Sequence, residues 1–139
     1  MIRLATAADI PALVTMGRKF HGMSHWAAIP YRDAPISASI AYLIDNHAVF
    51  VTEALDGALG VMTAPIFFSG DLMAQELFWW SDGAGALELL AEAERWAAEK
   101  GAVRFVMGRL DGLRDKALDR LYRRTGYAPI EHTYAKELS

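Results

Sequence analysis

The pattern of hydrophobic and polar residues predicts a chain in which strands and helices follow one another without long gaps. Residues 2–5 have the apolar pattern of a short strand. Thr6 has the position and residue type of a helix N-cap, Asp9 makes the first turn acidic, and Pro11 is tolerated there. Apolar residues continue with helical spacing as far as Phe20, so the first helix is expected to end there.

The next part of the chain is expected to be irregular before a second helix begins. Glycine and prolines, among them Pro35, interrupt regular structure within residues 21–35. Ser37 is then expected to cap a helix whose apolar side includes Ile40 and Leu43.

Three consecutive segments rich in β-branched and aromatic residues predict an antiparallel meander. They are residues 48–54, 58–68 and 74–80. The pair Asp56-Gly57 is a strong hairpin-turn signal between the first two segments. Residues 69–71 are a second turn signal between the last two.

The second half of the chain has the pattern helix, strand, helix, strand. Residues 83–86 open the clearest amphipathic helix, and Gly101 is its expected C-cap. A strand, an amphipathic helix and a last strand are expected over residues 103–107, 115–125 and 127–138. Antiparallel hairpins followed by a strand-helix-strand crossover predict an α/β (α+β) fold, with helices on both faces of a mixed central sheet.

Composition limits the classes of protein to be considered. The chain has 139 residues, 53% of them hydrophobic, with no repeats and no linker, which predicts a single domain over residues 1–139. The absence of cysteine excludes a disulfide framework, a thiolate metal site and a cysteine nucleophile. The net charge of -3 gives no general attraction to nucleic acid, and no apolar run is long enough to cross a membrane. Because the N-terminus has no signal-peptide pattern, we expect a cytoplasmic protein that binds neither nucleic acid nor membrane.

Four segments carry a resemblance to a known family. They are residues 2–13 (IRLATAADIPAL), 76–80 (ELFWW), 91–102 (AEAERWAAEKGA) and 121–131 (LYRRTGYAPIE). In this order they resemble the Gcn5-related N-acetyltransferases (GNAT family), and in particular a small bacterial and phage-borne subgroup with a degenerate phosphate loop. The resemblance covers nearly the whole chain and implies a mostly antiparallel central sheet. It also implies transfer of an acetyl group from acetyl-CoA to a primary amine of an unidentified small-molecule or protein acceptor. Homodimers are frequent in the family, so a homodimer is compatible with the sequence.

The phosphate loop is where this sequence departs from the family. The family loop usually has Arg or Gln, two further residues, Gly, one residue, and then Gly or Ala. The matching stretch here is shorter, lacks the basic or amide residue, and reads Ser81-Asp82-Gly83-Ala84-Gly85-Ala86. Its small residues at a helix N-terminus can still offer backbone N–H groups to a diphosphate, although Asp82 adds an opposing negative charge. The alternative is a tight strand-to-helix turn with Asp82 as N-cap.

The resemblance also implies that the strand ending at Trp79, Trp80 and Ser81 splays from its neighbour, so that its backbone can pair with the pantetheine arm of acetyl-CoA. Packing on the two faces of the sheet explains the two indole side chains equally well. Five basic residues lie on or just before one later helix: Arg114, Lys116, Arg120, Arg123 and Arg124. Of these, Arg123 is the candidate for a coenzyme A phosphate, and a solvated helix face is the alternative.

Two residues are candidates for the chemistry of acetyl transfer. Tyr122 matches the family Tyr that protonates the leaving thiolate, a role that suits a phenol with a pKa of about 10. Its alternative is a half-buried aromatic on the apolar side of the helix. Glu76 lies in an apolar strand, where burial would raise its pKa and make it a usable general base. A solvent-facing charge or an ion pair is the alternative for Glu76.

Other interpretations of the sequence concern metal binding and function. His21 and His25 are spaced for one helix turn, but no nearby carboxylate completes a ligand set, so no metal is expected. A catalytically silent module with the GNAT fold, associated with a phage or its virion, is the alternative to an enzyme. A third possibility is a structural domain whose aromatic loop around His25, Trp26 and Tyr31 contacts another protein.

Overall fold

A computed structural model describes residues 1–110 and 115–139. The chain forms two compact units, Met1–Gly108 and Arg109–Ser139. The first unit contains the sheet, and the described part of the second contains one helix and the C-terminal segment. The single domain expected over residues 1–139 stays a prediction.

The first unit is built on a five-stranded sheet with the order β1-β2-β3-β4-β5. The strands are β1 (Ile2–Leu4), β2 (Ala48–Thr52), β3 (Gly57–Pro65), β4 (Leu72–Ser81) and β5 (Arg104–Val106). Neighbouring strands are antiparallel except β4 and β5, which run parallel and are joined through α3 (Ala86–Glu99). The predicted meander and crossover are therefore confirmed, and with them the mixed, mostly antiparallel sheet.

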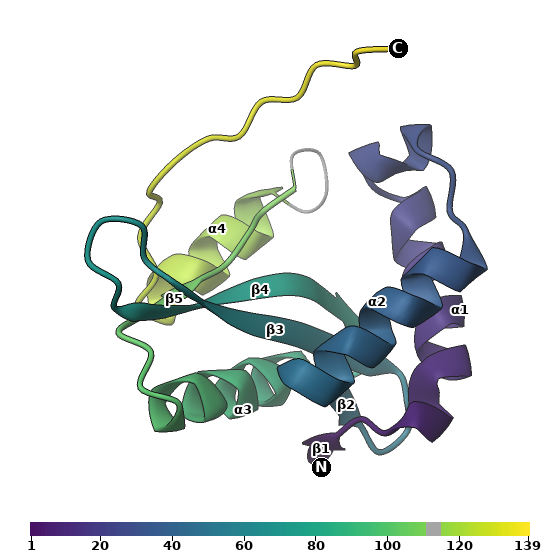
Figure 1. The fold of residues 1–139 in the computed structure, drawn as a ribbon, viewed down its shortest axis with the longest axis horizontal. Helices are drawn as coiled ribbons and strands as arrows, with labels where there is room; N and C mark the ends of the chain where they lie inside the picture. The colour runs from purple at the N-terminus through teal and green to yellow at the C-terminus, as the bar shows by residue number, and fades with distance from the viewer. Residues whose placement is uncertain (111–114) are drawn as a thin grey trace. The chain divides into compact units, whose positions relative to one another are not determined.

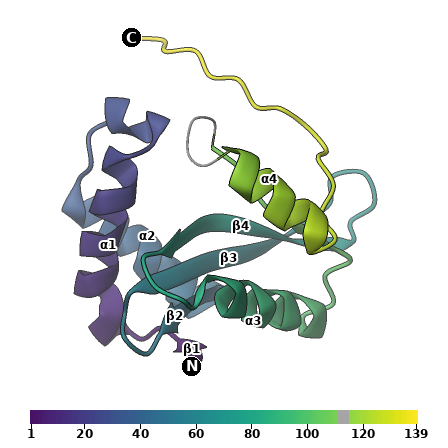
Figure 2. The ribbon, with the colours of Figure 1, turned by 180° about the vertical axis from the view of Figure 1, so that it is seen from behind.

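Helices cover both faces of this sheet, as Figures 1 and 2 show from opposite sides. The helices α1 (Ile10–Gly22) and α2 (Asp33–Asn46) pack on one face, where Leu13 and Ile40 are buried. The helix α3 covers the other face and buries Leu89 completely. Each such side chain contributes about 1.5–3 kcal/mol to folding. No helix in the described parts of either unit is long and apolar enough to cross a bilayer.

A capping box and an ion pair direct the chain from β1 into α1. The carboxylate of Asp9 accepts a hydrogen bond from the N–H of Thr6 at 2.8 Å, over the short 3-10 turn Ala7–Asp9. It also pairs with the Arg3 guanidinium through two contacts of 2.7 and 3.0 Å. These hydrogen bonds, first from Arg3 and then from Thr6, lower the pKa of Asp9 to about 2. Thr6 is the N-cap of this 3-10 turn, whereas the N-cap of α1 itself is Asp9, three residues later than predicted.

Two helix boundaries differ from the prediction. The helix α1 continues to Gly22 instead of ending at Phe20. The helix α2 begins at Asp33, so Ser37 is not its N-cap, and Pro35 lies inside its first turn. Because the N–H groups of a first helical turn have no acceptor within the helix, a proline there removes no hydrogen bond.

The first hairpin is confirmed, but its turn is longer than the Asp56-Gly57 signal predicted. Gly57 already belongs to β3, and the turn occupies residues 53–56 with Leu55 at a φ of 55°. The Thr52 hydroxyl closes the turn by accepting hydrogen bonds from the N–H groups of Asp56 at 3.0 Å and Gly57 at 3.2 Å. Hydrogen bonds to a side chain thus close this hairpin, where a two-residue turn was expected to close it.

The second unit contains α4 (Asp115–Arg124), and Gly126 follows it with a φ of 96°. Residues 127–139 form no strand, so the last strand expected there is wrong. Their apolar residues have strand-like spacing, but Tyr134 and Leu138 are 90% and 91% exposed. A strand requires a neighbouring edge for its backbone groups, and the described residues of this unit contain no other strand.

Candidate active site at the end of strand β4

The strand β4 leaves its parallel neighbour partway along its length. The strand β5 pairs with β4 only over residues 73–75. On the opposite side of β4, the register with β3 leaves one extra residue, Leu77, between Glu76 and Phe78. Such a bulge bends and twists its strand. It begins directly beyond the last pair with β5, so the end of β4 runs on without β5 beside it, as the resemblance implied.

Glu76 lies where β4 and β5 part. Its Oε1 accepts a hydrogen bond from the N–H of Gly108, 3.0 Å away and two residues beyond β5. Burial raises the pKa of Glu76 to about 7, and the Gly108 hydrogen bond offsets only part of this rise. Within the described residues this carboxyl forms no ion pair. The geometry therefore gives a carboxyl group that changes protonation state near neutral pH.

The two tryptophan side chains at the end of β4 pack against neighbouring elements. The indole Nε1 of Trp79 donates a hydrogen bond to the carbonyl oxygen of Ala86 at 3.2 Å, which ties the strand to the start of α3. Trp80 stacks on Phe78 and Phe20, with ring centroids 4.1 and 6.2 Å apart. Both side chains therefore contribute to packing. The ligand binding predicted for these two residues would involve their backbone groups.

The bend between β4 and α3 keeps its backbone donors available. Gly85 is the N-cap of α3, so the alternative that made Asp82 the N-cap is wrong. The Ser81 hydroxyl donates to the carbonyl oxygen of Gly83 at 3.2 Å. The N–H groups of residues 83–86 donate to no acceptor within residues 1–110 and 115–139. Free N–H groups entering a helix N-terminus are what an anion such as a diphosphate requires.

Two glycines let this bend sit directly on the turn between β2 and β3. A Cβ at Gly83 would lie 2.1 Å from Oδ2 of Asp56, and a Cβ at Gly85 would lie 2.7 Å from Cγ2 of Thr52. The Asp56 carboxylate is held by the Thr52 hydroxyl at 2.6 Å. Asp56 therefore adds a second negative charge to that of Asp82 beside the bend.

One cation from a distant part of the sequence reaches the bend. The Nζ of Lys19, on α1, lies 2.6 Å from Oδ2 of Asp82. Both side chains are about half exposed, at 55% and 46%. Neither this contact nor the position of Asp56 is indicated by the spacing of residues in the sequence. The missing basic residue of the loop was the one signal in the sequence for such a contact. An anion site that lacks a cation of its own requires a cation from another part of the chain.

The remaining candidates, Tyr122 and Arg123, lie on α4 in the second unit. The Tyr122 ring is half-buried, and its centroid is 5.7 Å from that of Tyr127. Arg123 is exposed and pairs with Asp119 at 2.9 Å, one helical turn earlier. Arg114 lies outside the described residues.

The two histidines singled out from the sequence have other partners. Nε2 of His21 is 2.6 Å from the carbonyl oxygen of Ile29. The ring of His25 contacts that of Trp26, with centroids 4.5 Å apart. In the described ranges, no three His, Asp or Glu residues come together as a possible metal site.

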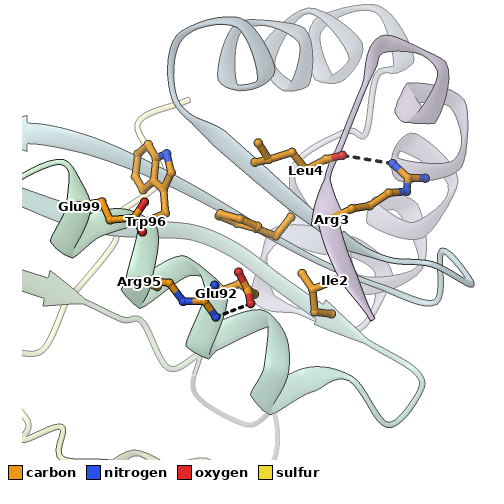
Figure 3. A pocket seen from close by; sticks show the side chains of 8 residues that line it. Ile2, Arg3, Leu4, Glu92, Arg95, Trp96 and Glu99 are labelled. Carbon is orange, nitrogen blue, oxygen red and sulfur yellow. Dashed lines mark hydrogen bonds and ion pairs between the residues drawn. The ribbon is translucent and has the colours of Figure 1, made fainter.

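A pocket of about 280 Å³ lies between β1 and α3 (Figure 3). It is lined by Ile2, Arg3, Leu4, Phe50, Glu92, Arg95, Trp96 and Glu99. Its arginines already have partners, because Arg95 pairs with Glu92 at 2.5 Å and Arg3 pairs with Asp9. None of the residues predicted to act in catalysis or cofactor binding lines this pocket.

Comparisons with known proteins support the fold. No family model and no curated protein matches this sequence. A transcriptional regulator from Bacillus halodurans matches with a TM-score of 0.76 and 20% identity, over 99% of both chains. A GNAT family acetyltransferase from Staphylococcus aureus matches with a TM-score of 0.68 and 13% identity, over 99% of this chain and 98% of the other. An aminoglycoside acetyltransferase from an uncultured soil metagenomic sample, in complex with sisomicin, has a TM-score of 0.68 and 19% identity, over 99% of this chain and 95% of the other.

The similarity to these solved structures concerns the fold. At such low identities they show that this chain has the fold of the GNAT acetyltransferases, and the predicted fold class is confirmed. Because one fold can carry many functions, the function of this chain depends on the residues of its site.

Proposed function

We propose that this chain is an N-acetyltransferase that takes an acetyl group from acetyl-CoA and transfers it to a primary amine. The observation that carries the proposal is the parting of β4 from β5 beside Glu76, whose pKa lies at about 7. A strand edge without its neighbour can pair with an extended ligand as it would with an added strand. The carboxyl next to it can accept a proton at neutral pH.

The bend and the end of β4 would together hold the donor. The free N–H groups of residues 83–86 suit the diphosphate, and the backbone of residues 79–81 would pair with the pantetheine arm. In this proposal Arg123 binds a further phosphate of coenzyme A. Acetyl-CoA supplies the activated acetyl thioester.

The proposed chemistry divides the proton transfers between two residues. Glu76 accepts a proton from the acceptor, so that the neutral amine can attack the carbonyl carbon of the thioester. The new C–N bond forms as the C–S bond breaks, and a backbone N–H of β4 stabilises the charge on the carbonyl oxygen. Tyr122 then donates its proton to the departing sulfur, which leaves as the thiol, and the resulting phenolate regains a proton from the second one that the amine nitrogen loses as the amide forms.

Ligand-induced stabilisation combined with turnover tests this proposal. Acetyl-CoA at a hundred times its Kd should stabilise the native state by about 2.7 kcal/mol. A panel of primary amines should then release free thiol, which a thiol reagent detects continuously, and Glu76→Gln should suppress that release. Absence of both the thermal shift and thiol release would overturn the proposal.

A catalytically silent module that binds a cofactor or a protein partner is the second candidate. The negative charges of Asp56 and Asp82 beside the bend favour it, because they weaken the attraction for a diphosphate. A thermal shift with acetyl-CoA but no thiol release across the amine panel would support this second candidate over the enzyme.

A further inference from the structure

The C-terminal half of α1 lies unusually close to the end of β4. A Cβ at Gly17 would be 2.7 Å from the Trp80 ring and 2.7 Å from the Tyr31 hydroxyl, so only glycine permits this approach without a shift. One turn further on, Phe20 stacks on the same Trp80 ring, with centroids 6.2 Å apart. The helix is therefore fixed against the strand that leads into the bend.

This packing places Lys19 at the bend. Its Nζ contacts Oδ2 of Asp82 at 2.6 Å, and Asp82 immediately precedes the donors of residues 83–86. A lysine ammonium has three N–H donors, of which one suffices for Asp82. Lys19 is also 55% exposed, so the remaining donors are accessible to a ligand. Asp82, which holds this cation, thus directly precedes the four residues with free backbone N–H groups.

We propose that Lys19 supplies the positive charge that the bend lacks in its own sequence, and that it binds the diphosphate of the donor while still paired with Asp82. This inference rests on the proposed function. It assigns Asp82 a positioning role for Lys19. It also explains how a bend flanked by two carboxylates can accept an anion, since Lys19 offsets the charge of Asp82 and its remaining N–H groups can donate to the ligand.

Comparing ligands with and without phosphates tests the assignment. We would measure the Kd of coenzyme A and of pantetheine, which has no phosphate, for the full chain and for Lys19→Met at low salt. We expect Lys19→Met to weaken coenzyme A binding roughly tenfold, as loss of one close charge at the protein surface predicts. Pantetheine binding should not change. Inorganic pyrophosphate should compete with coenzyme A in the unmodified chain and less well in the variant.

Two control variants separate charge at the bend from other effects. Lys100→Met removes the same charge just beyond the C-terminal end of the 14-residue α3, about 20 Å from the bend, and should leave both Kd values unchanged. Lys19→Arg should retain coenzyme A binding within about twofold, because it keeps the charge.

Three results would overturn the inference. If Lys19→Met binds coenzyme A as tightly as the unmodified chain, Lys19 does not contact the diphosphate. If it loses coenzyme A and pantetheine equally, Lys19 supports the packing of α1 only. If the unmodified chain binds neither ligand, the proposed function fails and this inference fails with it. The first two results would contradict this inference alone and would leave the proposed function standing.

Discussion

Glu76→Gln tests whether burial of this carboxyl shapes both stability and catalysis. The pKa of Glu76 is raised from 4.5 to about 7 in the folded protein. Between these two values the folded chain keeps the proton that the unfolded chain has lost, so stability falls as the pH rises. The whole difference corresponds to at most about 3 kcal/mol above pH 7. Gln has the same shape, carries no charge, and its oxygen can still accept the hydrogen bond from Gly108.

The expected result is therefore a gain of stability that depends on pH. At pH 5, where Glu76 is mostly protonated, the two proteins should unfold at similar urea concentrations. At pH 8, Glu76→Gln should be more stable by up to about 3 kcal/mol. All other titratable groups are the same in both proteins, so their contributions cancel in the difference. Two stability curves that stay parallel from pH 5 to 8.5 would refute the argument that burial perturbs this group.

The same substitution should separate stability from activity. If Glu76 is the general base, kcat/KM should rise through pH 7 as the carboxyl ionises and should fall by about 10²–10⁴ in Glu76→Gln. A variant that is more stable at pH 8 and much less active would indicate a residue whose charge is retained for function at the expense of folding. Full activity in Glu76→Gln would exclude the general-base role.

Further substitutions test separate parts of the structure. Tyr122→Phe should lower kcat while the Kd for acetyl-CoA stays within about twofold, whereas equal losses in both would indicate a packing role. Asp9→Asn should destabilise the protein by about 2 kcal/mol at pH 7, because the low pKa of Asp9 reflects stabilisation of its charged form by Arg3. This stabilisation is lost as the pH falls through 2. Urea unfolding of both proteins at pH 7 and pH 2 measures the difference. Gly17→Ala should destabilise by about 1–3 kcal/mol, because its methyl group would overlap the Trp80 ring, and an unchanged midpoint of thermal unfolding would contradict that contact.

The sequence could predict the elements of the sheet because their signals are local. The β-branched segments, the turn residues and the apolar stripe of α3 each depend on residues close together in the chain. The raised pKa of Glu76 could also be anticipated, since an acidic residue in an apolar strand has few routes to solvent. The prediction of a last strand was wrong because a strand also depends on residues that are distant in the chain. Spacing alone indicates a strand in residues 127–138, but only a neighbouring edge can satisfy its backbone groups.

The charge environment of the bend could not be predicted from the sequence. Lys19 and Asp82 are separated by 63 positions, and their contact depends on how closely α1 approaches β4. That approach depends on Gly17, which in the sequence is simply a glycine within a helix pattern. Asp56 was assigned to a turn, and nothing local indicated that the bend would pack on that turn. These are tertiary effects, which local propensity does not encode.

The bulge in β4 explains how Glu76 can lie in the same strand as Phe78 and Trp80 without sharing their face of the sheet. In a regular strand, Glu76 would share a face with Phe78, two residues later. The extra residue Leu77 changes this, because Glu76 lies opposite Val61 whereas Phe78 lies opposite Gly60, and adjacent residues of β3 face opposite sides of the sheet. Gly60 makes the arrangement possible, since a Cβ there would be 2.4 Å from the Phe78 ring. A glycine inside a strand is a signal for a bulge, so Gly60 was the residue from which the separation of Glu76 from Phe78 and Trp80 could have been predicted.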